Sequence, residues 1–173
     1  MQIEQEPCSV RRADLTGTDN EAVGRLVGAY LRQTEREKAF HLGLPEPGAD
    51  LPERYRAEVD NPARAYEHAE VFVAELDESP VGVVVVLEGS TVREVKRVWV
   101  DPRARGRRIG SALLDSALSE EDLPLRLTVW DWRDDAIRLY RKRGFITVAS
   151  WENRPRLLCM ERPAHPGATV QSA

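Results

Sequence analysis

Cysteine is scarce in this sequence. Its 173 residues include only Cys8 and Cys159, which lie at opposite ends of the chain. Neither belongs to a CxxC pair, so the spacing favours neither a zinc site nor a framework of disulfide bonds. We expect both residues to be reduced, structural thiols.

Long hydrophobic runs are also missing. The longest aliphatic run, residues 83–87, is far too short to cross a bilayer. The opening MQIEQEPC has neither the basic start nor the apolar segment of a secretory signal. We therefore expect a cytoplasmic protein that does not bind a membrane.

The sequence lacks a large excess of one charge, because 25 basic residues face 29 acidic ones, for a net charge of -4. Binding of nucleic acid by phosphate neutralisation needs a basic surplus, so no nucleic-acid partner is expected. A content of 42% hydrophobic and 31% charged residues is typical of one globular domain with its own core. We expect that domain over residues 1–163, and a disordered tail without apolar periodicity over residues 164–173.

Hydrophobic periodicity predicts a mixed chain of helices and strands. Thr18 and Glu21 form a capping box that opens a first helix, which the Pro- and Gly-rich segment 44–50 ends. A second helix stops before Asn61-Pro62. Strands are predicted at 9–12, 70–76, 80–87, 91–100 and 125–130, helices at 109–117 and from 136 to Gly144, and two last strands follow. The strands between 70 and 100 form an antiparallel meander.

One segment, VDPRARGRRIGSALL at residues 100–114, links the end of a strand to the start of a helix. The free N–H groups in the first turn of a helix bind anions, and Gly106 and Gly110 would let a ligand approach the backbone. The segment matches neither a Walker A loop nor the dinucleotide fingerprint. It predicts a diphosphate site, with a solvated basic turn as the alternative. Its arginines are Arg103, Arg105, Arg107 and Arg108.

This arrangement resembles the signature of the GNAT superfamily of acyl-CoA-dependent N-acyltransferases: Arg or Gln, two residues, Gly, one residue, then Gly or Ala. RGRRIG, residues 105–110, matches at the first and last positions. Arg108 replaces the middle Gly, which is compatible with the loop if Arg108 keeps ordinary helical torsions. VKRVWVDP and DDAIRLYRKRGF extend the likeness over residues 70–160. Arg133 stands where relatives commonly carry a cofactor-binding Asn, and that role is not carried over.

The resemblance implies the GNAT fold, an α/β (α+β) architecture with a mixed, mostly antiparallel sheet of six or seven strands that splays between strands 4 and 5. It also implies transfer of an acetyl group from acetyl-CoA to a primary amine by direct attack, without a metal. Main-chain groups of Val98 and Val100 would bind the pantetheine arm, and the N–H near Val98 would face the thioester oxygen. The other predicted donor-binding residues are Arg105, Gly106, Arg107, Arg108, Ile109, Gly110 and Ser111.

Tyr140 occupies the position of the tyrosine that is the general acid in many relatives. A phenol has an ordinary pKa of about 10, so it stays protonated at neutral pH, and that value exceeds the thiol's value of about 8.5 by only about 1.5 units. It can therefore donate a hydrogen bond to the leaving thiolate and release its proton late, at modest cost. Glu94 and Asp131 are candidate bases for the amine, although each is also consistent with a simple surface carboxylate. Trp130, Asp131 and Trp132 could wall the acceptor pocket, although an aromatic pair at a strand end is also consistent with packing.

Three other functions stay open. The protein could be a non-catalytic acyl-CoA sensor, an acyltransferase that takes its acyl group from an acyl carrier protein, or a nucleic-acid module that uses the arginines. His41 is expected to be exposed and without a role, and Trp151 and Glu152 have the same ambiguity as the tryptophan pair. The sequence leaves the acceptor undefined, and an edge strand near the C-terminus offers a possible homodimer contact.

Overall fold

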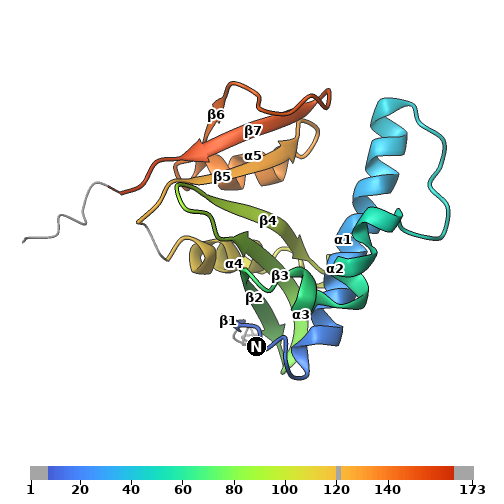
Figure 1. The fold of residues 1–173 in the computed structure, drawn as a ribbon, viewed down its shortest axis with the longest axis vertical. Coiled ribbons are helices and arrows are strands. Elements are labelled where there is room, and N and C mark those ends of the chain that lie inside the picture. Colours follow the sequence, from blue (N-terminus) through green and yellow to red (C-terminus); the bar gives the residue numbers. More distant parts are fainter. Residues whose placement is uncertain (1–7, 120–121, 166–173) are drawn as a thin grey trace, which may run out of the picture.

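The computed structural model describes residues 8–119 and 122–165, which form a seven-stranded mixed sheet flanked by helices (Figure 1). The strand order is β1-β2-β3-β4-β5-β7-β6. Every neighbouring pair is antiparallel except β4 and β5, which are parallel. The predicted GNAT-type sheet is thereby confirmed. The strands are β1 (Ser9–Arg12), β2 (Ala69–Leu76), β3 (Ser79–Leu87), β4 (Arg93–Val100), β5 (Leu125–Trp130), β6 (Ile146–Val148) and β7 (Leu157–Arg162).

Helices cover both faces of the sheet (Figure 1). Helix α1 packs across β3 and β4 on one face, while α4 packs across β1 to β4 on the opposite face. The side chains of α5 join the core on the α4 side. The helices are α1 (Asp19–Leu42), η1 (Glu53–Tyr55), α2 (Arg56–Asp60), α3 (Pro62–Ala65), η2 (Pro102–Ala104), α4 (Ile109–Ala117) and α5 (Asp134–Arg141).

The valine run of β3 explains why this strand lies at the centre of the sheet. Val83 and Val85 face α1, whereas Val84 and Val86 face α4, and all four are fully buried. A strand that is covered on both faces needs apolar side chains at every position, which is what the sequence provides. Gly82 of the same strand lets α4 approach closely, because an added Cβ would lie 2.9 Å from Leu113 Cδ1.

Helix α1 begins next to Thr18 as predicted, but the predicted capping box is wrong. The Thr18 side chain makes no capping hydrogen bond. Asp19 is buried instead, and its carboxylate accepts hydrogen bonds from the Asp14 N–H at 2.7 Å and from the Arg11 guanidinium at 2.7 and 2.9 Å. This ion pair ties the start of α1 to β1, a tertiary contact that local spacing could not reveal. At the other end, Gly43 caps the helix with a φ of +63°.

Strands β4 and β5 stay together only at their first residues. They pair at Arg93 with Leu125 and at Glu94 with Arg126, and then diverge, while β5 continues alongside β7 over its whole length. The register between β3 and β4 shifts between Val83 and Val85, and the irregularity in β4 includes Arg97, with a φ of +57°. The predicted splay is present, and it leaves one edge of β4 without a neighbouring strand over residues 95–100.

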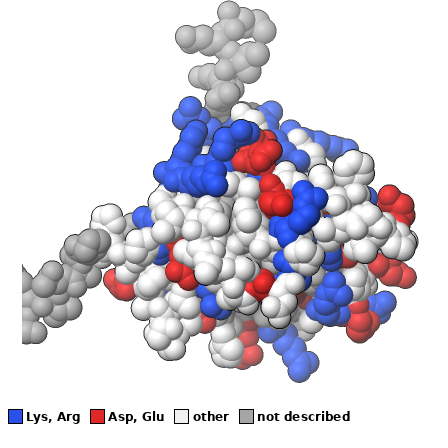
Figure 2. Space-filling view, turned by 90° about the horizontal axis from the view of Figure 1, so that it is seen from above, with Lys and Arg blue, Asp and Glu red and all other residues white. Residues whose placement is uncertain are grey.

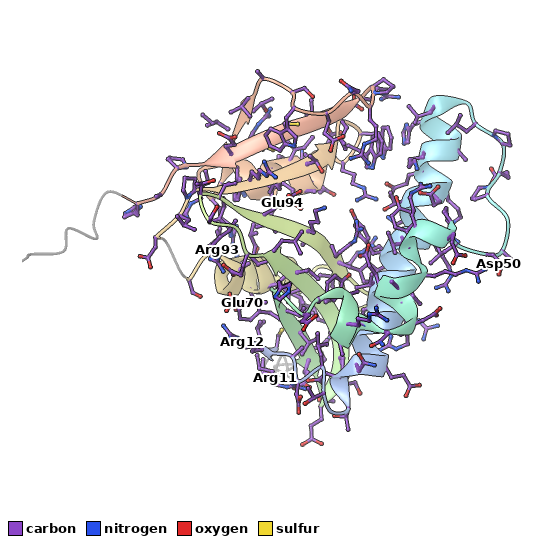
Figure 3. All side chains as sticks on the ribbon, viewed as in Figure 1. Arg11, Arg12, Asp50, Glu70, Arg93 and Glu94 are labelled. Atoms are coloured by element: carbon purple, nitrogen blue, oxygen red, sulfur yellow. The ribbon has the colours of Figure 1, made fainter. Side chains whose placement is uncertain are left out.

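Buried charges hold the paired end of β4 (Figure 3). The Arg93 side chain is 4% exposed and binds Glu70 of β2 at 2.7 Å and Glu88 at 3.0 Å. Arg12 of β1 joins the same Glu70 carboxylate. Because both carboxylates converge on this arginine, the start of β4 is fixed to the meander, and the divergence from β5 occurs only farther along the strand.

Several expectations concern features outside this sheet. Residues 166–173 of the predicted tail lie outside the described residues. Within residues 8–119 and 122–165, no helix is long and apolar enough to cross a membrane. The same residues contain no group of three or more His, Cys, Asp or Glu that could hold a metal ion. The face shown in Figure 2 carries basic and acidic side chains next to one another at several places.

Candidate active site

A cavity of about 1060 Å³ opens where β4 and β5 diverge. Residues 95–100 of β4, the start of α4, the start of α5 and one face of α1 form its walls. Its volume is at the upper end of the range for small-molecule sites. Eleven of the predicted site residues line it: Val98, Val100, Arg105, Gly106, Arg108, Ile109, Gly110, Ser111, Trp130, Trp132 and Tyr140. The structure does not bring Glu94, Arg107 or Asp131 into this lining.

The start of α4 forms the predicted anion cradle, with one correction. Arg108 has φ 59° and ψ 21°, so it adopts the left-handed conformation and not the ordinary helical torsions that the sequence comparison required. The chain turns into α4 at this residue, and the Arg108 carbonyl accepts the first helical hydrogen bond, from the Ala112 N–H. The N–H groups of residues 109–111 therefore have no acceptor within the helix and face the cavity end of α4.

Arg105 lies along the cavity wall. Its Nε donates to the Val100 carbonyl at 3.1 Å, and its guanidinium stands 4.8 Å from the centre of the Trp99 ring. Its Nη2 reaches Gln33 of α1 at 3.4 Å. The Val100 carbonyl, one of the main-chain groups predicted to bind the pantetheine arm, thus already accepts one hydrogen bond from the protein in this conformation and has a second lone pair for a ligand. Arg105 connects the loop, β4 and α1.

Tyr140 projects from α5 into the cavity. The residue is 7% exposed, and its ring packs edge-on against Phe145 at 5.9 Å between centroids. Within the described residues its hydroxyl makes no hydrogen bond, so the group is available to a ligand. Burial raises the pKa of the Tyr140 phenol, the nearby Tyr30 adds to this shift, and the positive charge of Arg133 partly offsets it. The hydroxyl therefore keeps its proton at neutral pH.

A polar bridge joins α1 to the start of α5 across the cavity. Glu37 accepts hydrogen bonds from Trp132 Nε1 at 3.1 Å and Arg133 Nε at 2.8 Å, and Arg133 Nη2 donates to Thr34 Oγ1 at 2.8 Å. Burial alone would raise the pKa of Glu37, but hydrogen bonds from Gln33, Trp132 and Arg133, with the Arg133 charge, hold it below its ordinary value. Glu37 is therefore ionised and positions its partners.

Three flat rings stack at the same end of the cavity. Trp130 and Trp132 lie 4.8 Å apart between centroids at 9°, and His41 covers the other face of Trp132 at 4.4 Å and 12°. The expectation that His41 is exposed is wrong, because the residue is half-buried and lines the cavity within this stack. Arg156 holds the stack from outside, 5.1 Å from the Trp132 ring and with Nη1 3.1 Å from the His41 carbonyl.

The two predicted bases lie away from this lining. Glu94 is at the paired end of β4, where Arg126 at 3.3 Å and Lys96 at 3.6 Å surround its carboxylate (Figure 3). Asp131 forms an ion pair with Arg156 at 2.9 Å. Both predictions used strand position alone, which does not show where the strands separate or which arginine faces each carboxylate.

A second buried ion pair supports the irregular part of β4. Arg97 Nε and Nη2 bind both oxygens of Glu58 on α2, at 2.7 and 2.8 Å, and the Tyr66 hydroxyl donates to Glu58 at 2.7 Å. Burial alone would raise the pKa of Glu58, but the hydrogen bond and the charge of Arg97, together with Tyr66, lower it overall. This arrangement fixes an arginine in the cavity wall immediately before Val98.

Most residues of the α1 wall were not predicted from the sequence. The described lining from this helix includes a polar stripe that continues the apolar face at helical spacing. This spacing could have indicated the wall, because polar side chains on the buried face of a helix need hydrogen-bond partners. The structure places Thr34 on that face, with 7% of the residue exposed. The stripe consists of Tyr30, Thr34, Glu37 and His41.

Comparison with known proteins agrees with this architecture. Residues 67–147 match the family described as the acetyltransferase (GNAT) domain. An uncharacterized N-acetyltransferase of Methanocaldococcus jannaschii is 34% identical over 85 residues, which are 43% of this chain and 38% of that protein. The match thus spans about two fifths of that curated relative.

Solved structures extend the likeness to nearly the whole chain. A GNAT-family acetyltransferase from Staphylococcus aureus Mu50 superposes with a TM-score of 0.67 at 13% identity, covering 92% of this chain and 100% of that one. The PaiA N-acetyltransferase from Thermoplasma acidophilum, in complex with coenzyme A, superposes with a TM-score of 0.61 at 16% identity. This superposition covers 91% of this chain and 99% of the Thermoplasma chain. At these identities the superpositions establish the shared fold.

Proposed function

Because the chain belongs to the GNAT superfamily of acetyltransferases, we propose that it transfers an acetyl group from acetyl-CoA to a primary amine by direct attack on the thioester. One observation carries this proposal: the free edge of β4 opens directly beside the N-terminus of α4. An amide-bearing arm can bind along such an edge as an added strand. The N–H groups of residues 109–111 can then hold the diphosphate of the same ligand.

Two groups of the chain would act on the reacting thioester. The backbone N–H of Val98, in the irregular part of β4, would stabilise the negative charge that develops on the thioester oxygen. The Tyr140 hydroxyl keeps its proton because burial raises its pKa, so it would donate a hydrogen bond to the departing thiolate and release its proton only late, since a raised pKa makes the phenol a weaker acid. Neither Cys8 nor Cys159 lines the cavity, which supports direct attack over a covalent acyl-enzyme.

The attacking amine must lose a proton before it reacts, and this proton needs an acceptor. Glu37 is the carboxylate on the α1 wall, but its lowered pKa and its hydrogen bonds to Trp132 and Arg133 make it a weak base. Glu94 and Asp131 lie outside the cavity lining. We propose that the amine loses its proton to solvent and attacks as the free base.

A pair of variants at one position tests the donor assignment. A Cβ at Gly110 would lie 3.8 Å from its nearest neighbours, so Gly110→Ala fits without a clash. An acidic residue in the first turn also favours the helix, so Gly110→Asp should fold. We expect calorimetry to show micromolar binding of acetyl-CoA to the wild type and to Gly110→Ala, but not to Gly110→Asp. No binding of acetyl-CoA by the wild type, or equal binding by Gly110→Asp, would overturn the proposal.

An acyl carrier protein is the second candidate donor. Arg103 and Arg107 are exposed near the start of α4 and outside the cavity lining, where an acidic carrier could contact them. If the carrier is the donor, Arg103→Gln with Arg107→Gln should raise its KM strongly, and free CoA should compete poorly. If acetyl-CoA is the donor, the double variant should leave its KM within about twofold, because exposed charges contribute little.

A further inference from the structure

We infer that the cavity contains a site for an anionic group of the acceptor, so that the substrate is an amine that also carries a carboxylate or a phosphate. This inference deepens the proposed N-acetyltransferase function and rests on it. Its basis is a basic cluster that lines the cavity and comes from three separate parts of the chain. The cluster consists of Arg54 of η1, Lys96 and Arg97 of β4, and Arg154 of the segment between β6 and β7.

Two members of the cluster, Arg54 and Arg97, lie against the same aromatic ring. The Arg54 guanidinium lies 4.5 Å from the centre of the Tyr55 ring, and the Arg97 guanidinium lies 5.6 Å from the same point. The hydrogen bond that Arg154 donates to Glu152 raises the pKa of Arg154 and Tyr55 adds to this shift, while burial and the positive charge of Arg97 lower it. Arg154 and Arg97 therefore lie close enough to repel one another within one cavity.

The carboxylates near this cluster do not neutralise it. Glu35 is shared by Lys38 at 2.9 Å and Arg54 at 3.7 Å. Glu94 is likewise shared by Lys96 at 3.6 Å and Arg126 at 3.3 Å. Arg54 and Lys96 are thus each beyond hydrogen-bond distance from a carboxylate that also serves another cation. Positive charge remains for a ligand.

The two better paired arginines also keep a donor for a ligand. Arg97 uses Nε and Nη2 to bind Glu58, and Arg154 uses Nε and Nη2 to bind Glu152. Within the described residues, the Nη1 group of each makes no hydrogen bond or ion pair. A guanidinium whose orientation is already fixed loses little freedom when it binds a carboxylate or phosphate.

The position of the cluster relative to the proposed reaction is also suitable. Arg97 immediately precedes Val98, whose N–H is the proposed oxyanion donor, so an acid bound at Arg97 would hold the rest of a short amine near the thioester. The acidic residues of the described lining are Glu37, Asp134 and Asp135, and Glu37 is bound to Arg133. A second cation on the acceptor would meet repulsion at the cluster, which disfavours polyamines.

A panel of short primary amines tests the substrate class. β-Alanine and O-phosphoethanolamine carry a carboxylate and a phosphate, propylamine carries no second charge, and 1,3-diaminopropane carries a second cation. We expect kcat/KM from thiol release to be at least about tenfold higher for one of the two acids than for propylamine, and lowest for the diamine. Whichever of the two acids has the higher kcat/KM shows whether the site prefers a carboxylate or a phosphate. Turnover of the diamine that equals or exceeds that of both acids would overturn the inference.

Variants should separate the cluster from general charge effects. Lys96→Met and Arg154→Met should each lower the ratio of kcat/KM for the preferred acid to that for propylamine by roughly 10- to 100-fold. Lys142→Met, at an exposed position outside the cavity lining, should leave this ratio unchanged. Arg97 is not a suitable test position, because its loss would leave Glu58 and Tyr66 without their partner and could unfold the protein.

A binding measurement separates this inference from the proposed function. Succinate and inorganic phosphate are titrated at constant ionic strength into protein saturated with CoA. We expect one of them to bind the wild type and Lys142→Met, and to bind Lys96→Met and Arg154→Met about tenfold more weakly. If neither anion binds while propylamine is acetylated, the inference fails and the function stands. If an anion binds but no amine is acetylated, the transferase function fails and the anion site stands.

Discussion

The indole of Trp132 donates a hydrogen bond of 3.1 Å to the carboxylate of Glu37, although the two residues are 95 positions apart in the chain. Arg133 Nε donates to the same oxygen at 2.8 Å. One acidic side chain of α1 thus holds two of the three residues that lead from β5 into α5. Because β4 and β5 are not paired at this end, this bridge sets the distance between the two walls of the cavity.

Substitution Glu37→Gln should destabilise the protein by about 2 kcal/mol. The variant keeps the size of the side chain but leaves the largely buried Arg133 guanidinium without its counter-charge. Urea unfolding followed by tryptophan fluorescence measures the change. Glu53→Gln is the control, because Glu53 forms an exposed i,i+3 pair with Arg56 and such pairs contribute about 0.5 kcal/mol or less. Equal losses for the two variants would contradict a special role for Glu37.

The pH dependence of stability gives a second test of the same bridge. The pKa of Glu37 in the folded protein lies below that of the unfolded chain, for which the ordinary value is about 4.3. The folded state therefore binds fewer protons, and the contribution of Glu37 is complete above that value and is lost as the pH falls below it. The difference in unfolding free energy between wild type and Glu37→Gln should shrink between pH 6 and pH 3. A difference that is constant over this range would contradict the ionised bridge.

Tyr140→Phe should lower kcat by about 100-fold while leaving the affinity for acetyl-CoA nearly unchanged. The hydroxyl has no hydrogen-bond partner among the described residues, so its loss removes no internal contact, and the unfolding free energy should stay within about 0.5 kcal/mol. Steady-state kinetics with calorimetry separates the two effects. A variant with wild-type kcat would show that another group, or solvent, protonates the thiolate.

The pH profile of the wild type tests the two proposed protonation states together. An alkylamine has an ordinary pKa of about 10.4, so kcat/KM for such an acceptor should rise about tenfold per pH unit from pH 6 to pH 9. Tyr140 must keep its proton, and its pKa is raised above the ordinary value of about 10, so the profile should not fall below that pH. A plateau near pH 7 would instead indicate a general base of the protein.

The parts that the sequence predicted well depend on local patterns. Alternating and continuous apolar runs placed the first five strands within two residues of their ends, for example 91–100 against Arg93–Val100 for β4, whereas the last two strands were predicted without bounds. The arginine and glycine spacing placed the start of α4 at Ile109. Such patterns arise because each element buries one or both of its faces, and the spacing of its apolar residues follows the buried face.

The parts that it did not predict depend on contacts between distant segments. Glu94 and Glu37 are both acidic residues within regular elements, and only the point where β4 leaves β5 decides which one faces the cavity. Glu58 meets Arg97 because α2 packs against the irregular part of β4. Nothing in the local spacing of either residue encodes that meeting, so the basic cluster could be recognised only from the fold.

The left-handed conformation of Arg108 leads to a prediction of increased stability. A side chain in this conformation costs about 1–2 kcal/mol, while glycine adds about 0.4–1 kcal/mol of unfolded-state entropy. Arg108→Gly should therefore raise the unfolding free energy by about 0.5 kcal/mol. Arg107 does not have a positive φ, so the control Arg107→Gly should lower the unfolding free energy by about that amount. If both variants are destabilised equally, the strain at Arg108 is not relieved by glycine.

Two glycines at the interface of α4 should respond in opposite directions to the same substitution. A Cβ at Gly82 would lie 2.9 Å from Leu113 Cδ1 and 3.1 Å from the Trp99 carbonyl oxygen, and the second neighbour is backbone that cannot move aside easily. Gly82→Ala should lower the unfolding free energy by about 1–3 kcal/mol, because α4 must withdraw from β3. Gly110 lies within α4 with 3.8 Å of clearance, so Gly110→Ala should raise the unfolding free energy by about 0.5–1 kcal/mol through helix propensity.

The packing of α4 on β3 should also affect binding of the donor. Since a withdrawn α4 also moves the N–H groups of residues 109–111 away from the β4 edge, Gly82→Ala should weaken acetyl-CoA binding as well. Unchanged binding by a destabilised Gly82→Ala would show that the start of α4 is positioned independently of its packing on β3.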